Sequence, residues 1–401
     1  MLNFYSFLIR SVPVFVLLVF AGNHGISKIQ VGPVPIIELM LLVFLSVYAF
    51  IKIPIHSTFP IFIYFSWFLF SFIFILKAFP SSGIYAFRDG IQVLDSLYVF
   101  VGFACCHFFF SSNTVGANYF YKIRALLYFI SIFYCFAYLV GAKLTYITLV
   151  NTYLLFIVSS LVFYFNTKSD LTKIFISILF LIIGFLIFEK RTIYFSLICS
   201  FAVMIFFNRS ARVYLPYLVL VFSVFFLLLY TFIEPFSSAI SKIYAHLLTS
   251  FGVYDVRFVS AYQGVVLRGH WFSQIFKDLM SSWDNIVFGL GYGIPLTDFL
   301  GPDGKIIREP HNSFLSVIAR SGLVGFSLWL SLNIIFIKNL VKVIINTDGH
   351  VQRYFIICLF YILLVFVLAI SQDALERNFN VAPLYFIYGV STYYYSRLKN
   401  I

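Results

Sequence analysis

Residues 213–233 read VYLPYLVLVFSVFFLLLYTFI, an apolar run that contains no charged side chain. A stretch of roughly 20 apolar residues is long enough to cross a bilayer as an α-helix. A strand of an outer-membrane barrel would instead alternate polar and apolar side chains, and this run shows no such alternation. The run therefore predicts a membrane-spanning helix.

The whole chain of 401 residues has the same character, with 62% hydrophobic and only 10% charged residues. Soluble domains carry roughly 25% charged residues, and this chain has too little polar surface to cover a water-soluble fold of its size. The formal net charge is +12, but the lysines and arginines are scattered one or two per loop. That pattern is typical of membrane anchoring. We therefore expect an integral membrane protein with no nucleic-acid partner.

Apolar runs bounded by charge, proline or glycine predict an all-α polytopic membrane protein with about twelve helices. The runs lie near residues 5–21, 34–51, 59–76, 91–110, 125–141, 146–165, 174–188, 192–207, 213–233, 313–336, 354–371 and 381–396. Residues 1–233 then hold nine helices, 234–312 form a loop, and 313–401 hold three helices. With the N-terminus in the cytoplasm, the inner connections hold twelve Lys and Arg and the short outer loops seven. This bias favours both termini inside.

The connection in residues 234–312 is rich in aromatic and aliphatic residues, so its composition does not predict disorder. Two sets of apolar residues in it recur at helical spacing: Phe236, Ile240, Ile243 and Leu247, and then Leu267, Trp271, Ile275 and Leu279. They predict two amphipathic helices at the outer membrane surface, with Arg268 at the start of the second. A loop of this length in a compact protein is usually functional.

The loop enters the tenth predicted helix through Glu309-Pro310-His311-Asn312-Ser313. Pro310 disfavours a helix before it, and Asn312 or Ser313 suits the N-cap position. His311 is therefore expected at a helix N-terminus near the outer membrane surface. There the helix dipole favours the neutral imidazole, which can accept a proton from a hydroxyl. A capping histidine without chemistry is the alternative.

Helix arithmetic places the residues that follow. Gly322 comes eleven positions after His311, about three turns, so it should lie nearly below it. With Gly325 it would leave a smooth strip that another helix or a lipid chain can approach. Arg320 should point to the opposite side, where we expect a packing or ion-pair role. Residues 289–293, GLGYG, are expected to be a flexible turn near the membrane and not a nucleotide loop.

Arginines near this histidine are candidates for binding phosphate, because a guanidinium stays charged and contacts oxyanions in a bidentate manner. Arg191 ends the short turn between the seventh and eighth predicted helices and faces the same compartment as Arg268. A topological anchor is the alternative for Arg191. Arg257 and Arg308 are further phosphate candidates, although we favour a solvated loop charge for each.

A metal site is not expected, and neither is a cofactor. The 234–312 loop holds seven acidic residues but neither a DxD pair nor an HExxH motif. The five cysteines lie in apolar runs, without the spacing of metal ligands.

The run His311-Asn312, nine residues, Gly322, two residues, Gly325 resembles the signature of the O-antigen polymerase and O-antigen ligase superfamily. Arg268, the tryptophan after it and residues 284–291, DNIVFGLG, are similar to the sequence that precedes the histidine in that family. The turn that holds Arg191 also matches the family's arginine at the outer end of a helix. The resemblance covers roughly residues 174–335.

The resemblance implies a metal-independent membrane glycosyltransferase with a GT-C-like fold. It would act on undecaprenyl-pyrophosphate-linked oligosaccharides at the periplasmic face of the bacterial inner membrane, in lipopolysaccharide biosynthesis. Arg191 and Arg268 would then neutralise the pyrophosphate, while His311 would activate or orient the acceptor hydroxyl. Asn312 would bind the substrate beside it. A chain-length regulator protein is an expected partner.

Among the functions within this resemblance, we expect an O-antigen polymerase. The close alternative is an O-antigen ligase, which uses the same donor but takes lipid A–core as the acceptor. A flippase for the same lipids is less favoured, because the informative residues lie at one membrane surface and not at the midplane site typical of transporters.

Overall fold

The computed structural model describes residues 59–111, 259–299, 308–371 and 378–399, together with isolated positions elsewhere. This part of the chain is mostly helical. The helices are α3 Ile61–Ser82, α4 Ile84–Asp89, α5 Ile91–Asp95, α6 Tyr98–Ser111, α13 Val259–Leu279, α14 Trp283–Phe288, α15 Ser313–Ile345, α16 Gly349–Ser371 and α17 Asn378–Lys399. Two short strands, β1 Gln30–Val31 and β2 Val34–Pro35, pair in antiparallel orientation.

Two of these helices, α3 and α15, are long and apolar enough to cross a membrane. On α3 large apolar side chains also face outward, with exposed fractions of 85% for Phe62 and 58% for Ile73, while Tyr64 and Trp67 are buried. A helix that is apolar on all sides belongs either in a protein interior or in a bilayer.

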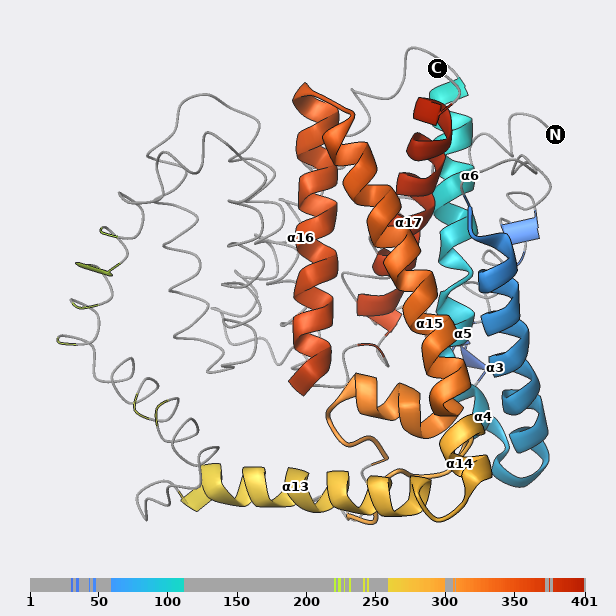
Figure 1. Cartoon of the computed structure of the whole chain (residues 1–401), viewed down its shortest axis with the longest axis vertical. Helices are drawn as coiled ribbons and strands as arrows, with labels where there is room; N and C mark the ends of the chain where they lie inside the picture. Colours follow the sequence, from blue (N-terminus) through green and yellow to red (C-terminus); the bar gives the residue numbers. More distant parts are fainter. Residues whose placement is uncertain are drawn as a thin grey trace.

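Among the described helices, α6 and α17 make the most extensive contact, and they run alongside each other in Figure 1. Their backbones approach closely at two glycines. A Cβ atom on Gly102 would collide with the carbonyl oxygen of Phe386, and one on Gly389 with that of Val99. Small residues at such positions are a common way for membrane helices to pack closely.

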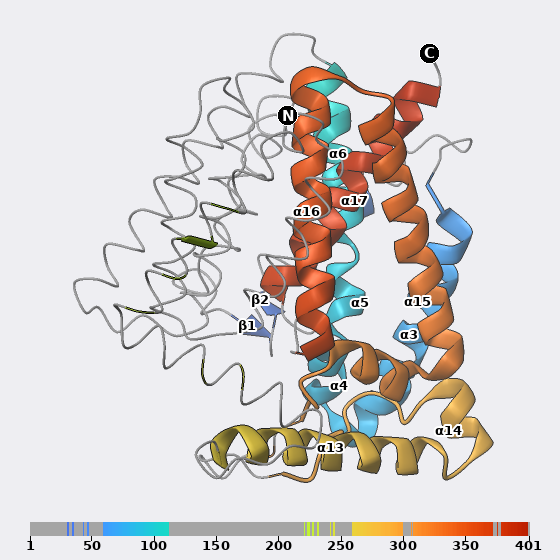
Figure 2. The same ribbon diagram turned by 60° about the vertical axis from the view of Figure 1, so that its left-hand side comes forward.

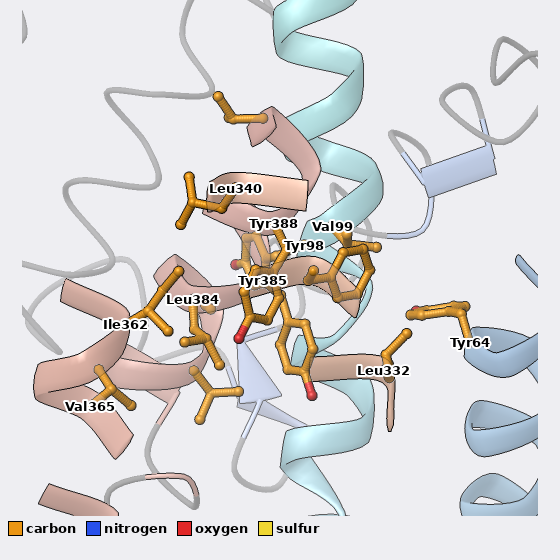
Figure 3. Packing of buried hydrophobic residues seen from close by; sticks show 14 of the residues in the cluster. Tyr64, Tyr98, Val99, Leu332, Leu340, Ile362, Val365, Leu384, Tyr385 and Tyr388 are labelled. Carbon is orange, nitrogen blue, oxygen red and sulfur yellow. The ribbon is translucent and has the colours of Figure 1, made fainter. Parts of the chain in front are cut away.

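The core between α3, α6, α15 and α17 is rich in aromatic side chains. Figure 3 shows Tyr385 and Tyr388 of α17 in one cluster with Tyr98 of α6. Two buried hydroxyls find partners there: the Tyr388 hydroxyl donates to Asn333 Oδ1 at 3.0 Å, and the Tyr64 hydroxyl lies 3.0 Å from the Ser96 hydroxyl. These bonds offset the cost of burying polar groups.

Helix α15 is broken near its start. Gly322 has φ 63° and ψ −170°, which is not helical and divides the element into residues 313–321 and 323–345. The second part runs along the bundle, whereas the first turns across one end of it (Figure 1). Helix α13 lies across this same end, transverse to α15 and α16 in both views (Figures 1 and 2).

Most predicted helices that fall on described residues are confirmed, usually with longer bounds. The runs 59–76, 313–336, 354–371 and 381–396 correspond to α3, α15, α16 and α17. The run 91–110 is divided into α5 and α6, with a turn at Ser96 and Leu97 between them.

One predicted helix is wrong at its start. Val34 and Pro35 form β2, although positions 43, 46 and 47 further along that run are helical. Prolines at positions 33 and 35 explain the difference, because proline lacks the N–H that a helix interior needs. The described positions within 213–233 are helical. The remaining predicted spans and the amphipathic helix around 236–247 lie outside the described residues, apart from single positions.

Candidate functional site

His311 occupies an unusual backbone position. Its φ is 54°, the one positive φ of a non-glycine residue in the described part of the chain. The next residue, Asn312, is the N-cap of α15, and its Oδ1 accepts the Leu315 N–H at 3.0 Å. Ser313 Oγ accepts the N–H of Leu375 at 3.0 Å, which attaches this helix start to the chain before α17. A left-handed backbone at a side chain other than glycine costs about 1–3 kcal/mol and is often kept where function requires it.

The ring of His311 packs against Trp271 of α13, with the two ring centroids 5.8 Å apart. Trp271 is buried, and its indole N–H has no acceptor among the described residues. Two residues one and two turns further along α13, Ile275 and Leu279, form a second hydrophobic cluster with Leu315 and other residues near the start of α15. The apolar face that the sequence predicted for α13 therefore holds this helix under His311.

Arg268 lies one helical turn before Trp271, so the two side chains leave the same face of α13. The prediction that Arg268 opens this helix is wrong, because α13 begins nine residues earlier at Val259. Val259 starts the helix with Val-Ser-Ala-Tyr-Gln, a mildly polar sequence whose helical periodicity is weak. Arg268 is exposed. Desolvation by the surrounding chain still lowers the pKa of its guanidinium, but the ordinary value is so high that the charge is kept.

The glycine-rich segment after α14 is not the flexible turn that was predicted, because its backbone binds to the break in α15. The N–H of Leu290 donates to the carbonyl of Ala319 at 2.6 Å, and that of Gly291 to the carbonyl of Arg320 at 3.2 Å. Gly289 and Gly291 both have positive φ, and a Cβ on Gly289 would meet the backbone of Arg320 and Gly322. Glycine is needed here for close approach of two backbones.

The same contact means that Gly322 does not lie where a continuous helix would place it. The prediction that Gly322 lies three regular turns below His311 is wrong, because the helix does not continue through Gly322. The prediction that another segment approaches closely at Gly322 is confirmed, because a Cβ on Gly322 would collide with the carbonyl of Val287. The approaching residue belongs to the short helix α14. At Gly325 a side chain of α3, Phe70, lies close by.

The contact between the glycine-rich segment and the break in α15 is called the joint below. A buried ionic cluster lies beside it, and the sequence did not indicate the central residue of that cluster, Asp89. The Asp89 carboxylate is fully buried at the end of α4 and contacts Arg320 Nη1 at 2.9 Å and Arg308 Nη2 at 3.0 Å. It also accepts the N–H of Gly293 at 3.0 Å. Asp89 precedes a glycine in an apolar region, with no motif around it, so only its placement in space reveals its role. The ion-pair role expected for Arg320 is confirmed.

The predicted site residues therefore fall into three groups. Arg268 is part of α13, and the His311 ring packs on Trp271 of the same helix. Asn312 and Arg308 lie close to His311 in the chain, but Asn312 Oδ1 caps α15 and the Arg308 guanidinium pairs with Asp89. The interpretation of Arg308 as a solvated loop charge is wrong, because its side chain is only 11% exposed and is paired with Asp89. Arg191 and Arg257 lie outside the described residues.

The chemistry available at this end of the bundle is that of an imidazole packed on α13 and of an exposed guanidinium one turn along that helix from the packing contact. An imidazole can accept a proton from a hydroxyl, and a guanidinium can hold a phosphate oxygen. In the described part of the chain, no group of three or more His, Cys, Asp or Glu is placed to hold a metal ion.

Comparison with protein-family models finds no match for this chain, and comparison with curated proteins finds none either.

Proposed function

We propose that the protein is an O-antigen polymerase, a metal-independent glycosyltransferase with about twelve membrane helices in a GT-C-like arrangement. It transfers the growing glycan from undecaprenyl pyrophosphate to a hydroxyl of the incoming lipid-linked repeat unit, at the periplasmic face of the inner membrane. The bond between the donor sugar and the pyrophosphate breaks, and a bond from that sugar carbon to the acceptor oxygen forms. The acceptor proton passes to His311, and undecaprenyl pyrophosphate leaves.

The observation that carries this proposal is the position of His311 on Trp271. The histidine has a left-handed backbone directly before a capped helix, and its ring lies 5.8 Å from a buried indole. Packing of this kind holds a reacting group in place, which is where much of the rate enhancement of an enzyme arises. A histidine that served only as a polar surface residue would not need a backbone conformation that costs free energy.

Arg268 supports the same assignment from one turn away on α13. Its exposed guanidinium can neutralise the charge that develops on a departing pyrophosphate, a task that a divalent ion performs in other enzymes. Arg191 is the second arginine proposed for this task.

The membrane setting is supported by the arrangement of the helices. Helix α13 lies across the end of the bundle that contains α3 and α15, the two helices able to span a membrane (Figures 1 and 2). An amphipathic helix placed transverse to spanning helices suits the plane of the bilayer surface. A lipid-anchored substrate would meet the site at that surface.

The direct test supplies the purified full-length protein with labelled lipid-linked repeat units and separates the products by size. A ladder of polymers without any added acceptor is the expected result. Products that form only when lipid A–core is added would identify a ligase instead. No glycan transfer under either condition, with protein that is folded and inserted, would exclude both enzymes.

Two histidines allow a matched comparison of variants. His311→Asn should abolish the ladder, with a loss of at least about 100-fold expected for a general base. His270→Asn makes the same chemical change at an exposed residue of α13, whose ring nitrogen Nε2 lies 3.9 Å from the Asp298 carboxylate. It should keep full activity. In cells that carry His311→Asn, single repeats should still reach the periplasm; their retention in the cytoplasm would indicate a flippase.

A further inference from the structure

Arg320 is a buried arginine that uses only part of its hydrogen-bonding capacity. Its side chain is 3% exposed, and Nη1 donates to Asp89 and to the carbonyl of Ile294. Nε and Nη2 are also buried, and neither has a hydrogen-bond partner among the described residues. These two nitrogens form the side of a guanidinium that binds two oxygens of one oxyanion at once.

The balance of charges around Arg320 also favours binding of an anion. Arg308 and Arg320 both pair with Asp89, so among the described residues two guanidinium groups share one carboxylate and one positive charge is left over. Beyond them, Arg88 and Glu309 pair at 3.7 Å and cancel each other. A buried charge without a counter-charge is costly, so this cluster is suited to an anion with a single negative charge.

Two buried hydroxyl groups belong to the surroundings of this cluster, Tyr292 through its interaction with Arg320 and Ser71 through its interaction with Tyr292. Tyr292 is buried, and it interacts electrostatically with both Arg320 and Asp89. Burial raises the pKa of Tyr292, and the neighbouring hydroxyl of Ser71 lowers it in part, so the phenol keeps its proton at neutral pH. Ser71 on α3 is fully buried, and its Oγ makes no hydrogen bond of good geometry within the described part of the chain. All of these groups can donate hydrogen bonds.

We propose that Arg320, Tyr292 and Ser71 form a buried site for an oxyanion with one negative charge, either a phosphodiester or a carboxylate. Arg320 contributes the paired N–H groups of Nε and Nη2, and the two hydroxyls contribute further donors. Arg320 belongs to residues 313–321, the short first part of α15 that begins two residues after His311. The existence of the site does not depend on the proposed function. The identity of the oxyanion does: as part of the lipid-linked substrate it would be the inner phosphate or an acidic sugar.

The test measures the melting temperature of the full-length protein in lipid nanodiscs, at constant ionic strength, with three small probes. Dimethyl phosphate represents the phosphodiester, glucuronate represents the acidic sugar, and glucose is the neutral control. A ligand that binds the folded state raises the melting temperature in a saturable way. We expect such a rise with dimethyl phosphate or with glucuronate, and the one that acts identifies the source of the oxyanion. No rise beyond that caused by sodium chloride would overturn the proposal and leave buried water as the partner of Arg320.

Variants locate the effect. Arg320→Lys keeps the charge beside Asp89 but loses the paired donors, and it should weaken the apparent Kd by about tenfold or more. Tyr292→Phe and Ser71→Ala are milder changes to the same site, so they remain informative if Arg320→Lys does not fold. Arg397→Lys, at the C-terminal end of α17, is the matched control and should bind as the unmodified protein does. If all three site variants kept unmodified affinity, the oxyanion would bind elsewhere and the proposal would be wrong.

This experiment needs no turnover. Anion binding that is lost in the site variants, from a protein that makes no polymer, would support the site and reject the polymerase. Polymer formation without anion binding would support the polymerase and reject the anion site.

Discussion

Arg268 and Arg308 were both candidates for binding phosphate, and the fold gives them opposite surroundings. Arg268 stands exposed on α13, one turn from the tryptophan that packs on His311. Arg308 precedes His311 by three residues, yet its guanidinium is paired with the buried Asp89 and also donates to the carbonyl of Gly293. Closeness in sequence to a candidate catalytic residue therefore says little about which arginine remains available to a ligand.

The comparison separates two tasks at this end of the bundle. One set has the groups that a substrate could meet: the exposed Arg268, the half-buried His311 and the buried Trp271 on which His311 packs; we call it the exposed set after Arg268. The buried set, centred on Asp89, connects α4, the glycine-rich segment and α15. Changes in the exposed set should affect turnover, and changes in the buried set should affect folding first.

The largest effect is expected for Asp89→Ala. It would leave Arg308 and Arg320 buried without their counter-charge, a loss of about 3–5 kcal/mol for a broken buried pair. We expect little folded protein in the membrane, measured by size-exclusion chromatography of the solubilised protein. Arg268→Ala, an exposed charge deletion, should change the unfolding free energy by less than about 0.5 kcal/mol. Equal yields of the two variants would contradict the division into buried and exposed sets.

Gly289→Ala should have the next largest effect, because it tests the joint that links the two sets. Its φ of 83° is unfavourable for alanine, and the new Cβ would also meet the backbone of Arg320 and Gly322. We expect a loss of about 3 kcal/mol or more, since strain alone accounts for about 1–3 kcal/mol. Thermal unfolding of the purified variant measures this loss.

Gly291→Ala is the matched control for that change. Gly291 has φ 91°, but open space surrounds its Cβ direction. The variant should therefore show the strain cost without the collision, about 1–2 kcal/mol. If Gly291→Ala were the more damaging of the two, close approach of the backbones would not be the reason for glycine at position 289.

Local patterns in the sequence were sufficient to predict much of the fold. Periodicity placed the buried face of α13, with Trp271, Ile275 and Leu279 inside, because that face is set by the 3.6-residue repeat alone. The helix start at Asn312 or Ser313 followed from the proline and the polar residues before an apolar run, and the structure places the N-cap at Asn312. Both depend on neighbours within a few residues.

What could not be predicted depends on contacts between distant segments. Asp89 and Arg308 are 219 positions apart, and neither belongs to a motif that would indicate the pairing. The break at Gly322 was missed for a similar reason: a glycine within an apolar run is compatible with a continuous helix, and only the approach of Val287 explains its backbone. The packing of His311 against Trp271 likewise joins distant segments of the chain, so it could not be predicted from either residue's neighbours.

A smaller effect, confined to turnover, is expected for Trp271→Phe. Phenylalanine keeps an aromatic ring under His311 but removes the buried indole N–H, which has no acceptor among the described residues. If that N–H binds the substrate, polymer formation should fall about tenfold, as for the loss of one hydrogen bond to a charged or polar group. The control is Trp283→Phe, the same change at a side chain that is 81% exposed. Equal activity in both variants would remove Trp271 from the substrate-contacting set.

The smallest effect concerns Asn312, which was expected to contact substrate but whose Oδ1 caps α15. Asn312→Ala should cost about 1 kcal/mol of stability, the usual effect of losing an N-cap. Serine and aspartate are equally good caps, so Asn312→Ser and Asn312→Asp should restore stability. If capping is the whole role of this residue, both should also restore polymer formation, because the position of His311 depends on the same helix start. Restored stability with lost activity in both variants would instead show that the amide meets the substrate, and Asn312 would then join the exposed set with His311 and Arg268.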